Sequence, residues 1–89
     1  MRERVVEQRL TSSVKSLGGW SVKLLPSVAG LPDRIVLLPG GRIEFVELKA
    51  PTGRLSAVQE VIHDRLSSLG FSVSVLYSPE QVDEWVMSL

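Results

Sequence analysis

The sequence contains no cysteine and a single histidine among its 89 residues. A chain without cysteine forms no disulfide framework, no cysteine-ligated zinc site and no thiol nucleophile, and one histidine excludes a histidine-rich metal cluster. Any catalytic chemistry must therefore come from carboxylates, lysines and the metal ions that carboxylates bind.

The sequence also lacks a long apolar run. No run approaches the roughly 20 residues that a membrane span needs, and the first residues, Met-Arg-Glu-Arg-Val-Val, lack the apolar stretch of a signal peptide. The composition, 44% hydrophobic and 22% charged, is close to the globular average. We therefore expect one folded domain over residues 1–89 that does not associate with a membrane and stays in the compartment where it is made.

The net charge at pH 7 is zero, which excludes a uniformly basic nucleic-acid binder. The charges are nevertheless segregated along the chain. Residues 1–59 hold nine Lys/Arg and five Asp/Glu, whereas residues 60–89 hold one Lys/Arg and five Asp/Glu. Either the basic part contacts a polyanion or both parts are ordinary solvated surfaces, and charge alone does not decide between these interpretations.

Hydrophobic periodicity predicts three helices and four strands. Residues 2–17 and 56–69 place apolar side chains three or four positions apart and are followed by glycine, which is typical of amphipathic helices. Ser78-Pro79 is typical of the start of a helix, and this last short helix is expected to run toward Leu89. Strands are predicted at residues 20–25, 34–38, 43–49 and 71–77.

The predicted order, α-β-β-β-α-β-α, defines an α/β fold. The first three strands should form an antiparallel meander, with a glycine-rich turn at residues 39–42 between the second and third. The fourth strand follows a helical crossover and should lie parallel to the third. Apolar residues of the second and third strands fall on both faces, so we expect a mixed four-stranded sheet with helices on both faces.

Asp33, Glu47 and Lys49 are the candidate catalytic residues. Asp33 precedes the second strand, and Glu47 and Lys49 share a face at the end of the third because side chains alternate along a strand. A two-residue hairpin loop at Gly40-Gly41 would place Asp33 on the opposite face. A loop of three or five residues, or one bulge, would place it on the same face, and the sequence does not fix the choice.

Two carboxylates and a lysine in this arrangement suit metal-dependent hydrolysis of a phosphodiester bond. The carboxylates bind a hard divalent cation, and the lysine orients or deprotonates the attacking water. A carboxylate from the first helix, Glu3 or Glu7, could complete the coordination, and their spacing of one helical turn does not choose between them. The alternative interpretation is that Asp33, Glu47 and Lys49 form only surface ion pairs.

Other polar and aromatic residues have structural interpretations. Ser56 and Gln59 match a helix capping box. His63 is expected to be a partly exposed surface residue rather than a metal ligand. Trp20 and Trp85 are expected to anchor the core or an interface rather than to stack on bases.

Five stretches of the sequence match one known family, in family order and over nearly the whole chain. They are residues 7–19, Gly30-Leu-Pro-Asp-Arg-Ile-Val-Leu-Leu-Pro-Gly-Gly-Arg42, Phe45-Val-Glu-Leu-Lys-Ala-Pro51, Leu55-Ser-Ala-Val-Gln59 and Leu69-Gly-Phe71. Together they resemble the virus-type replication-repair nuclease (VRR-NUC) domain, a branch of the PD-(D/E)xK nuclease superfamily. The resemblance implies a restriction-endonuclease-like core and a single nuclease domain over residues 1–89. It also implies the free-standing kind found in the cytoplasm of bacterial or phage-infected cells.

The resemblance assigns roles to the candidate residues. It implies that Asp33 and Glu47 bind Mg²⁺ or Mn²⁺, that the carbonyl of Leu48 adds a ligand, and that Lys49 acts on the water.

For the first helix, the resemblance favours Glu7 over Glu3 as the acid that reaches the metal, directly or through water. It also implies that Gln59 lies near the catalytic site while it caps its helix.

As a function, the resemblance implies a metal-dependent DNA endonuclease. Free-standing forms resemble homodimeric resolvases of four-way (Holliday) junctions, whereas fused forms are associated with flap and crosslink repair. The alternative is a non-catalytic DNA-binding or dimerisation module that keeps the nuclease fold. For a homodimer, the candidate contacts are Trp85, Val86, Met87 and Leu89 near the chain end, or the exposed side of Trp20.

Overall fold

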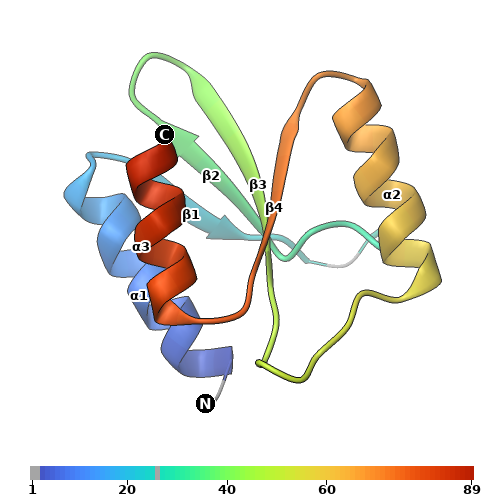
Figure 1. The fold of residues 1–89 in the computed structure, drawn as a ribbon. Coiled ribbons are helices and arrows are strands. Elements are labelled where there is room, and N and C mark those ends of the chain that lie inside the picture. The colour runs from blue at the N-terminus through green and yellow to red at the C-terminus, as the bar shows by residue number, and fades with distance from the viewer. Residues whose placement is uncertain (1–2, 26) are drawn as a thin grey trace.

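The structure is a computed structural model that describes residues 3–25 and 27–89. A four-stranded sheet carries helices on both faces, with two helices packed side by side on one face and one helix on the other (Figure 1). The elements are α1 (Glu3–Ser16), β1 (Trp20–Lys23), β2 (Arg34–Leu38), β3 (Arg42–Leu48), α2 (Ala57–Ser68), β4 (Ser72–Leu76) and α3 (Pro79–Ser88). This order, α-β-β-β-α-β-α, confirms the predicted fold. No helix in the two described ranges has the length and apolarity that crossing a membrane requires.

The strands are ordered β1-β2-β3-β4, and β2 and β3 are central, as predicted. β1 and β3 run antiparallel to β2, whereas β4 is parallel to β3, as expected for a crossover through α2. Leu38 pairs with Arg42, so the hairpin loop has three residues, 39–41. Gly40 and Gly41 in this loop have φ angles of 82° and 77°, a region that other residues rarely adopt.

The main core lies between the sheet and the pair α1 and α3. Val6, Leu10 and Val14 form the buried stripe of α1, as their spacing predicts. They pack with residues from the sheet and from α3, namely Val36, Val46, Leu48, Leu76, Val82 and Trp85. Trp85 is therefore a core residue of the monomer.

The opposite face of the sheet carries α2, which packs against β4. The apolar residues that recur along this helix are only partly buried. Val58 and Leu69, for example, are exposed. The residue that α2 buries is His63. Ser56 caps the helix as predicted, with Gln59 completing the capping box.

Apolar side chains remain exposed where α2 does not cover this face. Trp20 pairs with Leu37, and Leu37 pairs with Ile43, so these three side chains form a row on one face. Phe71 packs edge-on against Phe45, with the ring centroids 5.6 Å apart. Trp20 is 67% exposed, Ile43 39% and Phe71 40%. We refer to these five residues as the open apolar face.

Candidate active site

Asp33, Glu47 and Lys49 lie together at one end of the central strands. The pairing of Arg34 with Val46, continued by one residue, places Asp33 opposite Glu47 and on the same face. The N–H of Leu48 donates a 2.9 Å hydrogen bond to Asp33 Oδ2. Lys49 Nζ lies 3.8 Å from Glu47 Oε2. The three-residue hairpin loop thus sets the register of the two strands that places both carboxylates and the amine on one face of the sheet.

Glu47 is the most deeply buried member of this group, with 2% of its surface exposed. Burial, then a hydrogen bond to Asp33 and the charge of Asp33, together raise the pKa of Glu47 to about 7 against the opposing charge of Lys49. Glu47 Oε1 has no hydrogen-bond partner in the described part of the chain. A hydrogen bond to this oxygen would satisfy it, and a cation bound to the other carboxylate oxygen would stabilise the ionised form.

The donor set fits a divalent metal ion that retains water ligands. Carboxylate and carbonyl oxygens are the ligands that Mg²⁺ prefers, and Mg²⁺ commonly uses only one or two protein carboxylates. Within residues 3–25 and 27–89, no three acidic or histidine side chains converge into a complete metal site. Asp33 and Glu47 would therefore hold such an ion together with backbone, water or phosphate oxygens.

Glu7 is not part of this cluster. Its Oε2 accepts a hydrogen bond from Arg34, which is buried on the sheet face that α1 covers. Arg34 follows Asp33 in the chain, and neighbouring residues of a strand point to opposite faces. A role of Glu7 as a metal ligand thus requires this ion pair to open. Glu3, the other acid considered, is exposed.

Gln59 completes the capping box of α2, as its sequence pattern predicts. Its side-chain Oε1 accepts a hydrogen bond from the backbone N–H of Ser56, and the backbone N–H of Gln59 donates to Ser56 Oγ. Because the cap uses Oε1, the side-chain nitrogen of Gln59 is the atom left for a contact with substrate.

His63 faces the candidate site, so its predicted surface position is wrong. Its side chain is 7% exposed, and its Nε2 lies 3.9 Å from Glu47 Oε1. Burial lowers the pKa of His63, as does the charge of Lys49, while Asp33 and Asp64 act in the opposite direction. Its surroundings thus favour the neutral imidazole over the charged form. In the sequence, the spacing of four residues between Gln59 and His63 indicates that both lie on one face of α2.

A close backbone approach positions α2 beside the site. Gly30 has a φ of +89°, and a Cβ added there would lie 2.8 Å from both the carbonyl oxygen of Val58 and Cγ1 of Ile62. Only a residue without a side chain allows the loop before Asp33 to pack this tightly on α2. The close contact holds His63 on the site side of the sheet.

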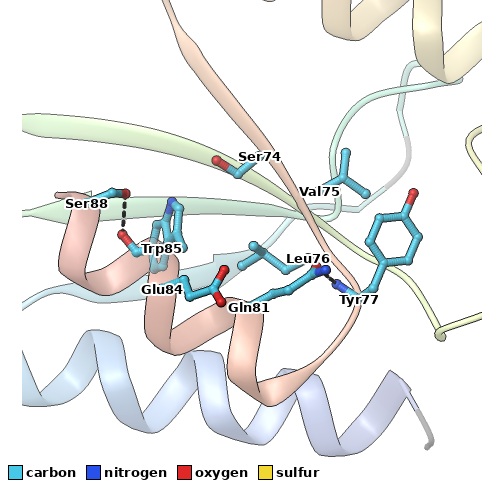
Figure 2. A pocket seen from close by; sticks show the side chains of 8 residues that line it. All are labelled: Ser74, Val75, Leu76, Tyr77, Gln81, Glu84, Trp85 and Ser88. Atoms are coloured by element: carbon cyan, nitrogen blue, oxygen red, sulfur yellow. Dashed lines mark hydrogen bonds between the residues drawn. The ribbon is translucent and has the colours of Figure 1, made fainter.

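A groove of about 500 Å³ lies between β4 and α3, and Asp33, Glu47, Lys49 and His63 are not among its lining residues (Figure 2). Its lining residues are Ser74, Val75, Leu76, Tyr77, Gln81, Glu84, Trp85 and Ser88. At one end, Gln81 accepts a hydrogen bond from the backbone N–H of Tyr77. The charged residue in the lining, Glu84, is acidic, so the groove does not suit a nucleic-acid backbone.

Comparison with known proteins identifies the family. The model of the VRR-NUC domain matches residues 6–80. Over 81 residues the chain is 43% identical to "Putative nuclease p44" of Acyrthosiphon pisum secondary endosymbiont phage 1, covering 90% of this chain and 87% of that protein. A solved structure described as a VRR_NUC domain aligns with a TM-score of 0.87 at 33% identity, covering 96% of this chain and 94% of the other. The chain belongs to the VRR-NUC domain family.

Proposed function

We propose that this chain is a metal-dependent endonuclease that hydrolyses phosphodiester bonds in branched DNA. The observation that carries the proposal is the Glu47 carboxylate, which is buried opposite Asp33 with its Oε2 3.8 Å from Lys49 Nζ. Burying such a carboxylate costs free energy unless a cation or hydrogen bonds compensate it. Membership in the VRR-NUC family and the relative named as a nuclease support this assignment.

In the proposed mechanism, Asp33 and Glu47 would hold Mg²⁺ or Mn²⁺ through carboxylate oxygens, and the Leu48 carbonyl would be the backbone ligand. Such an ion, when bound, would supply positive charge beside the phosphate and would lower the pKa of a bound water. Lys49 donates a hydrogen bond that orients the attacking water, and its charge stabilises the developing negative charge. Gln59 contacts the substrate through its side-chain nitrogen.

We further propose that the enzyme works as a single-domain homodimer in the cytoplasm of a bacterial or phage-infected cell. Contiguous exposed apolar surface commonly marks an interaction site, and the open apolar face is such a surface. A dimer would double the basic surface supplied by the ten Lys/Arg of one chain. Its two-fold symmetry matches the approximate symmetry of a four-way junction, so each site would act on one of two opposed strands.

The contact residues expected from the sequence separate into two groups. Trp85 is buried in the core, and Val86 and Leu89 pack against it, so these three complete the monomer. Trp20 and Met87 are exposed, Trp20 on the open apolar face and Met87 on α3. We place the dimer contact on the side of Trp20, because its apolar neighbours extend the surface there.

Cleavage of labelled DNA tests the proposal. Duplex, flap and four-way junction substrates are incubated with Mg²⁺, Mn²⁺ or EDTA, using the wild-type protein and Lys49→Ala. The expected result is metal-dependent cutting, strongest on the junction and lost in Lys49→Ala. Preferential cutting of flaps would instead indicate a flap-type nuclease. Binding without cutting in either metal would favour the alternative, a non-catalytic DNA-binding or dimerisation module.

A further inference from the structure

Two buried polar atoms face each other in the candidate site without forming a hydrogen bond. Glu47 Oε1 and His63 Nε2 are 3.9 Å apart, and neither has a hydrogen-bond partner among the described residues. Their separation exceeds the usual N–H···O distance by about 1 Å. It is also too short for a water molecule to lie on the line between them. A small rotation of either side chain would bring the two atoms into hydrogen-bond contact.

The two oxygens of Glu47 have different surroundings. Oε2 lies near the ammonium group of Lys49, at 3.8 Å, whereas Oε1 lies on the side of His63. Buried polar atoms almost always have a hydrogen-bond partner, so the positions of these two atoms favour their pairing. If Oε1 bonds to His63, the orientation of the carboxylate is fixed and Oε2 remains on the side of Lys49.

We propose that His63 is a positioning residue that donates a hydrogen bond from Nε2–H to Oε1 of Glu47. This bond directs Oε2 toward Lys49 and the metal position. The inference rests on the proposed function, because the ionised form of Glu47 is the one that binds a metal ion. His63 acts through Glu47 and makes no contact with the substrate.

The position of His63 is suited to this role. His63 lies on a helix that packs tightly against the loop before Asp33, so its ring does not depend on a flexible segment. Carboxylates that bind metals are usually held by a second hydrogen bond, and loss of such a partner typically lowers metal affinity or activity about 10- to 100-fold.

Two substitutions separate hydrogen bonding from packing. His63→Phe keeps a buried ring and removes the donor, whereas His63→Gln keeps a side-chain N–H donor. Mn²⁺ affinity is measured by calorimetry together with thermal unfolding and junction cleavage, and Glu60→Gln, an exposed change on the same helix, is the control. We expect Mn²⁺ binding to weaken about 10- to 100-fold in His63→Phe and to stay close to wild type in His63→Gln and the control.

The tautomer of His63 gives a second measurement that needs no substitution at position 63. Nitrogen NMR of the wild-type protein with Ca²⁺ should show the proton on Nε2, and Glu47→Gln should shift that signal. A proton on Nδ1, or Mn²⁺ affinity in His63→Phe equal to wild type, would overturn the inference. So would equal losses of affinity and stability in both His63 variants, because these indicate packing alone.

These outcomes are distinct from failure of the proposed function. A wild-type protein that neither binds Mn²⁺ nor cuts DNA would overturn the nuclease assignment together with this inference. A wild-type protein that binds Mn²⁺ and cuts DNA, with His63→Phe unchanged in both, would overturn the role of His63 alone.

Discussion

Asp33 Oδ2 accepts a 2.9 Å hydrogen bond from the backbone N–H of Leu48, which joins the loop before β2 to the end of β3. The bond gives Asp33 a structural role in addition to its proposed metal-binding role. Replacing Asp33 with alanine would leave the Leu48 N–H, in a residue that is itself buried, without its acceptor, at a cost of roughly 1–3 kcal/mol. Asparagine keeps an acceptor and removes the charge, so it is the better probe of catalysis.

We expect Asp33→Asn, Glu47→Gln and Lys49→Ala each to lower cleavage by several orders of magnitude. Each change removes one charged group from a site whose groups act together, so double substitutions should add little to the single ones. Single-turnover cleavage of junction DNA measures the loss, and circular dichroism checks that the fold is retained. Glu60→Gln, an exposed change on α2, is the control and should cut normally. Near-normal cutting by Lys49→Ala would refute the assignment.

The hairpin shows why part of this site could not be derived from the sequence. Alternation along β3 is enough to place Glu47 and Lys49 on one face. The side on which Asp33 lies depends on whether the loop has two or three residues, and two adjacent glycines are compatible with both. The pairing of Leu38 with Arg42 decides it, and this is a property of the folded hairpin.

His63 and Glu7 illustrate a different limit. The apolar spacing of α2 predicts its helical form, but not that the helix buries His63 beside Glu47. Glu7 is at the expected place in α1, yet Arg34 binds its carboxylate. Both outcomes depend on contacts between residues far apart in the chain. The periodicity of a single helix or strand carries no information about such contacts.

Divalent metal should raise the melting temperature of the wild-type protein. A cation between Asp33 and Glu47 relieves the repulsion and desolvation that their negative charges carry in the folded state. At a free metal concentration 100 times the dissociation constant, binding to the folded state alone adds about 2.7 kcal/mol. Calorimetric melts with Mg²⁺, Mn²⁺ or EDTA measure the shift. Asp33→Asn should lose most of it, and an equal shift in both proteins would place the metal elsewhere.

Without metal, the ionisation of Glu47 should lower the stability of the protein as the pH rises from about 5 to about 8. The pKa of Glu47 is raised from 4.5 to about 7 in the folded protein, chiefly by burial. The folded state therefore binds the proton more tightly than the unfolded state, and this stability is lost as Glu47 ionises. The shift corresponds to on the order of 3 kcal/mol.

Urea unfolding in EDTA across this pH range measures the effect. Glu47→Gln cannot ionise, so its stability should depend less on pH and exceed that of the wild type at pH 8. Saturating Mg²⁺ should remove the loss in the wild-type protein, because the cation takes the place of the proton. The lowered pKa of His63 acts in the opposite direction below about pH 6.5, so the comparison with Glu47→Gln is decisive. The same pH dependence in the wild type and in Glu47→Gln would contradict the expected pKa of Glu47.

Gly30 and Gly40 allow a matched test of the contact between α2 and the loop before Asp33. Both have positive φ angles, but a Cβ at Gly30 would clash with Val58 and Ile62, whereas a Cβ at Gly40 meets nothing within 4 Å. Gly40→Ala should therefore show only backbone strain, about 1–2 kcal/mol. Gly30→Ala should add a packing cost of about 1–3 kcal/mol to this strain, measured by urea unfolding. Equal losses would mean that the loop does not press on α2.

The last prediction concerns assembly and substrate. If the open apolar face forms the dimer contact, a charge introduced at its most exposed residue should dissociate the dimer, because burying an unpaired charge is costly. Trp20→Glu should therefore be a monomer by light scattering at micromolar concentration, while the wild type is a dimer. Met87→Glu is the control, since Met87 is 87% exposed on α3, outside this face.

The same two variants connect the dimer to junction cleavage. In a dimer whose two sites act on opposed strands, dissociation removes the preference for a four-way junction and leaves the chemistry of each site intact. Trp20→Glu should accordingly cut junction and linear duplex at similar rates, whereas Met87→Glu should keep the wild-type preference. If Met87→Glu dissociates the dimer and Trp20→Glu does not, the contact lies on α3. A wild-type protein that is monomeric and cuts duplex as readily as junctions would refute the symmetric dimer, because no second site would then be held at the opposed strand.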